Sequence, residues 1–351
     1  LKILKWLGRE DAPLLFRLRA DPQQWAWGLR FLAECFPGRN RANAAQLLRL
    51  GMYSRTALRD LRRATGITYD EQTRGILHFY LSEAELAASA RMSEYMRKLG
   101  SDRALKNAAQ CVAIEPALGA LGERLAGGTY SQEDESGDAH KFTLALAERC
   151  AAKGVRFENH VTIERIVAEG DRISQVDTQG VAPLRADAYV LCLGSYSPHF
   201  ARPLGIPLAI YPAKGYSVTM PVKNAASAWT VSLTDEAYKL VFSRFGERLR
   251  IAGTAELTGY DTSIREARCR AIVNRTLELF PDSGDATQAQ FWAGLRPATP
   301  SNVPYIGRTR YRNLYLNTGH GTLGWTHACG SGRALAEIVS GRNPEVNFTF
   351  T

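Results

Sequence analysis

The chain has 351 residues, enough for two domains or for one large α/β domain with an added lobe. Hydrophobic residues make up 45% and charged residues 23%, as in ordinary soluble globular proteins, and no apolar run approaches the roughly 18 residues of a membrane span. The net charge of +9 indicates either a basic solvated surface or an anionic partner, such as a membrane surface or an acidic substrate. We expect no nucleic-acid partner, because zinc-finger spacing and aromatic RNA-binding motifs are absent.

Neither the cysteines nor the histidines are spaced to bind a metal. The six cysteines are scattered without a C-x-x-C pair, and the six histidines show no ligand spacing. We therefore expect reduced thiols, a cytoplasmic location and no metal site. The first residues, LKILKWLGRED, lack the apolar core and cleavage site of a signal peptide.

The first third of the chain is predicted to be mostly helical, with a helical N-terminal segment over residues 1–60. Four large apolar residues recur at the spacing of one helix face: Trp25, Leu29, Leu32 and Phe36. Basic residues between Lys2 and Arg19 flank further apolar residues, including Trp6. A basic amphipathic stretch of this kind either lies on an anionic bilayer or packs in the core of a helical lobe, and the sequence leaves both interpretations open.

Residues 75–200 alternate between helical and extended patterns. We predict a strand at 75–82, a helix at 83–99 and a second helix at 140–154, which ends at a glycine. Short strands follow over VRFEN, VTIERIVAEG and RISQVDTQG. The segment ADAYVLCLGSYSP, residues 186–198, is predicted to be an apolar strand buried on both faces. It ends at Gly194 and Ser195, where α/β folds place their ligands.

The next part of the chain changes to antiparallel strands. KGYSVTMPV, YKLVFSRF and RLRIAGTAEL alternate in hydrophobicity, and the helix SIREARCRAIVNRTLELF follows them. The chain closes with FWAGLRPATP, the strand NLYLN, a glycine turn and a helix through GSGRALAEIVSG. This order predicts an α/β (α+β) fold, in which a nucleotide-binding domain is assembled from separate segments around an inserted antiparallel-sheet domain.

The glycine turn NTGHGTLGW has the G-x-G-x-x-G spacing of a dinucleotide-binding fingerprint. A strand precedes it and a helix follows, but no second strand with a terminal acid comes after, so it does not predict an ADP site. Two interpretations remain. The backbone N–H groups and the helix N-terminus could bind the N1–C2=O edge of a flavin, or the segment could be a tight turn without a ligand.

Several motifs carry a resemblance to one family. GLRPATPSNVPYIG and NLYLNTGHGTLGWTHACGSGRALAEIVSGR are similar to the C-terminal signature of the D-amino acid oxidase-like FAD-dependent oxidoreductases. Within that superfamily, the chain most resembles the small subunits of the bacterial D-amino acid dehydrogenases. VLCLGSYSP, YPAKGYSVTMPV and DEAYKLVFSRFGERLRIAGTAEL extend this resemblance over essentially the whole chain.

The resemblance implies FAD as cofactor and oxidative deamination of D-amino acids to 2-oxo acids and ammonia. Hydride would pass to flavin N5, and the electrons would pass to a quinone or other respiratory acceptor, with the protein peripheral on the inner face of the plasma membrane. It also implies the following division: substrate domain at 61–110 and 201–292, and FAD-binding domain at 111–200 and 293–351. The alternatives are an oxidase or dehydrogenase for glycine, sarcosine or D-hydroxyproline, and a catalytically silent remnant or subunit.

The resemblance also assigns site residues. Arg296, in GLRP, matches the arginine that anchors the substrate carboxylate, a role that suits a guanidinium fork, although a surface arginine beside a proline turn is the alternative. Tyr238 lies on the sheet that resembles the one facing the flavin, where it either contacts substrate or only packs. Val161 resembles the residue whose backbone meets the adenine. The remaining predicted cofactor contacts are Gly194, Ser195, Gly319, His320, Gly321, Thr322, Leu323 and Gly324.

One feature departs from the family. Its members begin with a strand, a G-x-G-x-x-G turn and a helix, and nothing similar precedes or includes LKILKWLGRED. The pyrophosphate would then lose its glycine loop and the ribose its acidic partner. The resemblance therefore predicts that the chain as written holds FAD poorly and shows little dehydrogenase activity.

Overall fold

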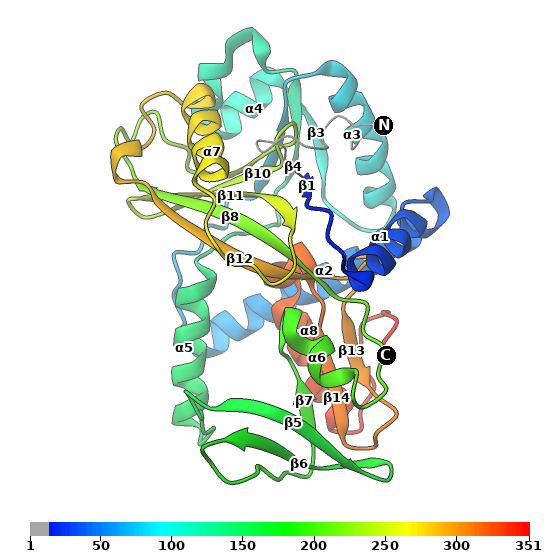
Figure 1. Cartoon of the computed structure of the whole chain (residues 1–351). Helices are drawn as coiled ribbons and strands as arrows, with labels where there is room; N and C mark the ends of the chain where they lie inside the picture. The colour runs from blue at the N-terminus through cyan, green and yellow to red at the C-terminus, as the bar shows by residue number, and fades with distance from the viewer. Residues whose placement is uncertain (1–13) are drawn as a thin grey trace. The chain divides into compact units, whose positions relative to one another are not determined.

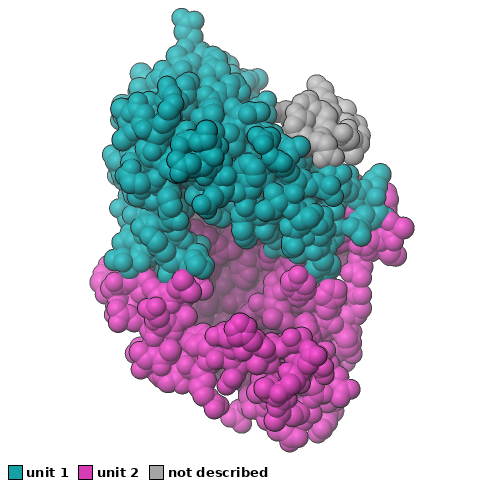
Figure 2. Space-filling model, turned by 60° about the vertical axis from the view of Figure 1, so that its left-hand side comes forward, with its two compact units in different colours: residues 1–19, 68–142, 213–295 teal, residues 20–67, 143–212, 296–351 magenta. Residues whose placement is uncertain are grey.

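The computed structural model of the protein describes residues 14–351, so the basic residues predicted to contact a membrane before residue 14 lie outside it. Figure 1 shows its helices and strands, and Figure 2 shows the two compact units that they form, in different colours. Unit 1 consists of residues 1–19, 68–142 and 213–295, and unit 2 consists of residues 20–67, 143–212 and 296–351. Each unit is therefore assembled from three separate stretches of the chain.

Unit 1 is built on a nine-stranded, mostly antiparallel sheet. The strand order is β12-β8-β11-β10-β9-β2-β4-β3, and β1 pairs with β11. The strands are β1 (Leu14–Phe16), β2 (Ile76–Tyr80), β3 (Ala104–Asn107), β4 (Gly127–Ser131), β8 (Tyr211–Pro221), β9 (Ser232–Asp235), β10 (Leu240–Phe245), β11 (Arg248–Leu257) and β12 (Gln290–Ala298). The helices are α3 (Glu83–Lys98), α4 (Ala108–Ile114) and α7 (Glu266–Leu279), with the 3-10 helices η2 (Pro116–Arg124) and η4 (Ala286–Gln288).

One face of this sheet forms the core of unit 1. In β10, Leu240 and Phe242 are buried while Val241 between them is exposed, as the period-two alternation of a strand requires. Phe242 packs against Trp229 and Phe280, with ring centroids 5.1 and 5.4 Å away. Burial of each such side chain stabilises the fold by about 1.5–3 kcal/mol, so this cluster fixes which face of the sheet is covered.

Unit 2 combines helices with two small sheets. Its helices are α1 (Pro22–Glu34), α2 (Pro37–Thr65), most of α5 (Ala139–Ala152), α6 (Ser197–Ala201) and α8 (Gly324–Val339), with the 3-10 helices η3 (Gly194–Tyr196) and η5 (Gly321–Leu323). Its strands are β5 (Thr162–Glu169), β6 (Arg172–Gln179), β7 (Tyr189–Leu191), β13 (Tyr305–Arg308) and β14 (Leu314–Thr318). β13, β14 and β7 form one sheet, and β5 and β6 form a hairpin.

Helices α2 and α8 cross in unit 2 with no room between their backbones. Gly330 of α8 donates its N–H to Ser54 Oγ of α2 at 3.0 Å. A Cβ on Gly330 would lie 2.8 Å from the Ser54 Cα, a distance that real Cβ atoms essentially never show. Glycine at 330 thus sets how closely α8 approaches α2.

The structure confirms the α/β class and most of the predicted elements. The strand predicted at 75–82 is β2, and the helix predicted at 83–99 is α3. The antiparallel strands predicted between 213 and 257 are β8, β10 and β11. The strand, glycine turn and helix predicted at the C-terminus are β14, η5 and α8.

Two strand predictions are wrong. VRFEN, residues 155–159, has no regular structure, and Val155 and Phe157 are each 50% exposed. Alternating hydrophobicity alone does not make a strand when no neighbour supplies hydrogen bonds. The long strand predicted at 186–198 is reduced to β7, because Gly194 (φ +53) turns the chain. β7 is also not buried on both faces, since Val190 is 43% exposed and β7 pairs only with β14 among the described strands.

We predict that Gly330→Ala destabilises the protein, because the new methyl group would force α8 away from Ser54. Overpacking of this kind costs about 1–3 kcal/mol in the free energy of unfolding. Gly332→Ala is the matched control, since no atom lies within 4 Å of its Cβ position and alanine favours the helix. Urea titrations followed by circular dichroism compare the two variants, and equal stabilities would contradict the proposed close crossing.

Candidate active site

The glycine turn between β14 and α8 requires glycine for two separate reasons. Gly319 and Gly321 have φ values of +84 and +52, which side-chain-bearing residues rarely adopt. A Cβ on Gly319 would also lie 2.8 Å from the Thr299 methyl carbon. The backbone of the turn is therefore closely packed against the segment that follows β12.

Segments far apart in the sequence meet at this turn within unit 2. Ala298 and His320 form an isolated antiparallel backbone bridge. Pro297 lies 3.8 Å from the Cβ position of Gly194. The structure thus places Gly194, the residues directly after Arg296 and the glycine turn together.

The turn presents hydrogen-bonding groups suited to a ligand. α8 has 16 residues, and no side chain caps its N-terminus, where the first backbone N–H groups of a helix point outward. The helix dipole adds partial positive charge at the same end. Asn317 Oδ1, at the end of β14, is buried and accepts no hydrogen bond from any residue between 14 and 351. A ligand with acceptor atoms on one edge and an adjacent N–H group matches this arrangement.

Two histidines near the turn are held neutral. Burial, with a smaller contribution from the charge of His327, lowers the pKa of His320 to about 4. Burial also lowers the pKa of His327 to about 4, although its ring nitrogen Nε2 contacts Leu47 O at 3.2 Å. His320 Nε2 lies 2.9 Å from Ser331 Oγ, which fixes the ring against α8. At neutral pH, neither ring adds a positive charge to this site.

Arg296 lies near the end of β12, two residues before the bridge to His320. Its side chain is half-buried, and the loss of solvent lowers the pKa of the guanidinium below its ordinary value. An arginine stays charged even then, because its unperturbed pKa is far above neutrality. A partly desolvated positive charge beside the glycine turn suits the carboxylate of a small substrate.

The other predicted cofactor contacts of unit 2 occupy different positions. Ser195 is buried in η3, directly after Gly194. Thr322 and Leu323 belong to η5, where Thr322 is exposed. Val161 lies immediately before β5 and is half-buried, and no contact shown here joins it to the glycine turn.

Tyr238 belongs to unit 1 and lies in the turn between β9 and β10. Its ring is 42% exposed, and the Arg275 guanidinium stacks on it at 4.2 Å from the centroid. Arg275 is itself held by Asp235 at 2.8 Å. The structure therefore gives Tyr238 a packing role against Arg275 and leaves part of the ring accessible.

The described residues contain neither a metal-binding cluster nor a membrane-spanning helix. Over residues 14–351, no group of three or more histidine, cysteine or acidic residues is placed to hold a metal ion. No helix in the same range is both long and apolar enough to cross a membrane.

Comparison with known proteins shows the class of the protein, a flavin-dependent oxidoreductase. The chain belongs to the FAD dependent oxidoreductase family, which matches residues 21–338. It is 56% identical to a D-amino acid dehydrogenase of Dechloromonas aromatica, over 99% of this chain and 84% of that protein. It is also 56% identical to a D-amino acid dehydrogenase of Paramagnetospirillum magneticum, over 97% of this chain and 81% of the relative.

Solved structures share the fold at low sequence identity. Glycine oxidase from Geobacillus kaustophilus superposes with a TM-score of 0.77 at 23% identity, covering 87% of this chain and 83% of that one. L-proline dehydrogenase from P. horikoshii has a TM-score of 0.75 at 17% identity, covering 85% and 80%. The predicted fold and family are confirmed by these comparisons.

FAD is the cofactor of this family, and the residues at the glycine turn fit its flavin ring. The ring carries acceptor atoms at N1 and C2=O, and an N–H donor at N3, between C2=O and C4=O. The N-terminus of α8, which no side chain caps, matches the acceptors, and the buried Asn317 Oδ1 matches the donor. These residues would hold the ring edge at the start of α8.

The sequence analysis missed two features of this region. Asn317 precedes the glycine turn directly, but only the structure shows that its amide oxygen is buried without a donor. Trp27 lies far from the turn in the sequence, yet its indole Nε1 donates to Ala298 O at 2.8 Å. No spacing pattern could have indicated that contact, because it joins residues 271 positions apart.

We predict that the buried histidines make stability pH-dependent. His327 has a folded-state pKa below its unfolded value, so the unfolded chain binds the proton first and stability is lost as pH falls from about 6.5 towards 4. Between pH 7 and pH 5, the free energy of unfolding should fall by about 1–2 kcal/mol more in the wild type than in His327→Gln. The control is His140→Gln, which replaces an exposed histidine. Urea titrations at both pH values measure the difference, and identical pH slopes in all three proteins would rule out this role.

Proposed function

We propose that the protein oxidises D-amino acids to 2-oxo acids and ammonia with FAD, and that the electrons leave to a quinone or another respiratory acceptor. The observation that carries this proposal is the 56% identity to D-amino acid dehydrogenases along nearly the whole chain. The placement of Arg296 two residues from the bridge to the glycine turn supports it. D-Alanine is the first substrate to test.

In this proposal, Arg296 binds the substrate carboxylate and sets the position of the α-carbon. A guanidinium fork makes two parallel hydrogen bonds to a carboxylate, which fixes orientation as well as affinity. FAD, when bound, supplies the hydride acceptor. The substrate CH–NH2 group loses two electrons and two protons to become an imine, and water then releases the 2-oxo acid and ammonia. Orientation can account for much of the rate if the amine arrives neutral, so the reaction does not depend on a side-chain base.

The two units would divide these tasks. We assign the FAD-binding domain to unit 2, because it contains the glycine turn, Gly194 and Ser195, with Val161 reaching the adenine through its backbone. We assign the substrate domain to the sheet of unit 1. Tyr238 would present its accessible ring edge to the substrate, held from behind by the stacked Arg275.

We predict that Arg296→Lys raises the KM for D-alanine about tenfold to a hundredfold, because an ammonium replaces two parallel hydrogen bonds by one. The affinity for FAD should change far less. Arg312→Lys is the control, since Arg312 is an exposed arginine paired with Asp171. Initial rates with a dye acceptor measure KM. An unchanged KM in flavin-loaded Arg296→Lys would contradict the assignment of Arg296 to the substrate carboxylate. Peroxide formation in place of dye reduction would instead identify an oxidase.

We further propose that α1 contacts an anionic membrane surface. Three apolar residues that recur along it are exposed in the structure, by 53% for Trp25, 68% for Leu29 and 59% for Leu32, and Phe36, directly before α2, is 68% exposed. Residues 22–65 carry eight arginines against two acids, Glu34 and Asp60. An apolar stripe on a positively charged surface is the pattern of an interfacial helix.

We predict that Leu29→Gln combined with Leu32→Gln weakens binding to phosphatidylglycerol vesicles by about tenfold or more, because two side chains can no longer enter the bilayer. The control pair is Leu105→Gln with Leu144→Gln, two leucines that are each 52% exposed elsewhere. Vesicle sedimentation at low and high salt gives the affinities. Equal binding by both pairs would show that the stripe has no part in membrane contact.

A further inference from the structure

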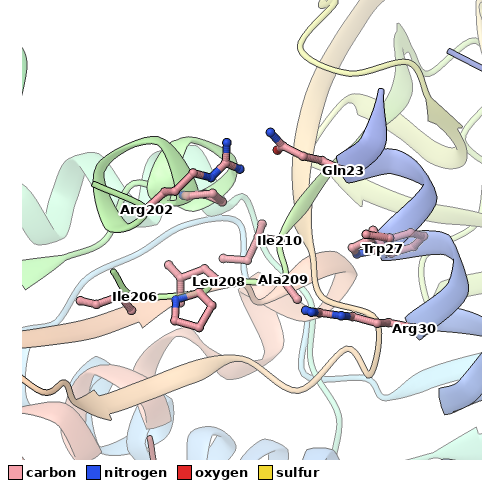
Figure 3. Close-up of a pocket in the computed structure, with 11 residues that line it drawn as sticks. Gln23, Trp27, Arg30, Arg202, Ile206, Leu208, Ala209 and Ile210 are labelled. Carbon is pink, nitrogen blue, oxygen red and sulfur yellow. The ribbon is translucent and has the colours of Figure 1, made fainter. Parts of the chain in front are cut away.

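A cavity of about 260 Å³ lies in unit 2 between α1 and the chain from Pro198 to Ile210. Figure 3 shows its residues, with the 206–210 segment as an apolar floor and α1 as one wall. This volume is at the small end of ligand pockets and suits a single ring rather than a large cofactor. No residue of the glycine turn lines the cavity, so the proposed flavin contact does not account for it.

Three polar side chains surround the cavity without internal partners. Gln23 and Arg30 come from α1, and Arg202 comes from the residue after α6. All three residues are exposed, and within residues 14–351 neither guanidinium makes an ion pair or a hydrogen bond, nor does the side-chain amide of Gln23 make a hydrogen bond. In Figure 3, Gln23 and Arg202 face each other across the cavity, and Arg30 points back towards the segment at Ala209. Donors therefore converge on an apolar space from different sides.

The cavity shares its walls with the glycine turn. Trp27, which lines the cavity, donates to Ala298 O, and Ala298 pairs with His320 of the turn. Ile210 on the floor of the cavity lies 3.3 Å from the Cβ position of Gly319. A single layer of side chains and backbone would thus separate a ligand in the cavity from the glycine turn, the segment that we assign to the flavin.

Helix α1 joins this cavity to the proposed membrane surface. Gln23, Ala26, Trp27 and Arg30 line the cavity and recur at helical spacing on one side of α1. The exposed stripe that begins at Trp25 occupies the opposite side of the same helix, because each residue advances about 100°. If α1 lies on the bilayer through its exposed apolar stripe, the cavity lies on the opposite side of the helix, which faces the protein. A molecule that leaves the membrane would then be within reach of the cavity.

We infer that this cavity binds the head group of a membrane quinone, the electron acceptor of the proposed function on which this inference rests. The ring would lie between Trp27 and the apolar floor, and its two carbonyl oxygens would accept hydrogen bonds from Gln23, Arg30 and Arg202. In the net reaction the amino acid loses two electrons and two protons, and the quinone gains both to become a hydroquinone. The guanidinium groups stabilise the negative charge that develops on the oxygens during reduction.

The first experiment measures binding of a decyl-substituted benzoquinone to the flavin-loaded protein by calorimetry, without any amino acid present. We expect one saturable site in the wild type and no binding in Ala26→Phe, which places a ring in the cavity. Ala336→Phe, at an exposed position of α8, is the control and should bind as the wild type does. No binding by the wild type, or equal binding by Ala26→Phe, overturns the inference.

The second experiment compares the quinone with a soluble dye as acceptor for D-alanine oxidation. In Arg30→Gln combined with Arg202→Gln, the ratio of quinone-dependent to dye-dependent kcat/KM should fall about tenfold or more, since charge-assisted hydrogen bonds are lost. Arg312→Gln combined with Arg342→Gln removes the same charge at exposed positions and should leave the ratio unchanged. An equal fall in both pairs overturns the cavity assignment. A wild type that reduces no dye contradicts the proposed function instead, and calorimetry then still decides whether the cavity binds the quinone.

Discussion

The backbone pairing of Ala298 with His320 is the contact on which the candidate site depends. It holds the residues after Arg296 against the glycine turn, and Trp27 adds a hydrogen bond to the same Ala298 carbonyl. Gly319 makes this approach possible, because any side chain there would meet Thr299. A shift of this one segment would therefore move Arg296, the start of α8 and the wall of the cavity at the same time.

The sheet of unit 1 depends on a different constraint, a buried carboxylate. Glu256 is fully buried, accepts a hydrogen bond from Tyr216 at 2.5 Å, lies 3.4 Å from Lys214 and also pairs with Arg17. Burial by itself would raise the pKa of Glu256, but these donors hold it below its usual value. Lys214 is equally buried and reaches Asp261 at 3.1 Å. Because removing one partner would leave a buried charge unpaired, β8 and β11 are held in one register by electrostatics as well as by hydrogen bonds.

The sequence was sufficient for elements with strong periodicity and for residues with distinctive chemistry. The glycine turn could be predicted because few residue types satisfy a tight turn, whereas the carboxylate-binding role of Arg296 stays a prediction. The prediction of a strand at 155–159 was wrong because the hydrophobic pattern does not reveal whether a neighbouring strand is present. The site as an assembly could not be predicted either, since the Ala298–His320 pairing and the buried oxygen of Asn317 arise from tertiary packing. Periodicity reports which face of an element is apolar, but not which element covers it.

Helix α1 shows why the sequence left membrane contact and core packing open. Trp25 and Trp27 are two residues apart and so point about 200° away from each other, which puts them on nearly opposite sides of the helix. Trp27 is 8% exposed and bonded to the protein interior, whereas Trp25 is 53% exposed. One side of α1 packs against the protein, and the opposite side is apolar and exposed. Such a helix has both the pattern of core packing and the pattern of a surface-binding helix. The two interpretations are therefore compatible for α1, because its inward side packs in unit 2 while its outward apolar side stays exposed among residues 14–351.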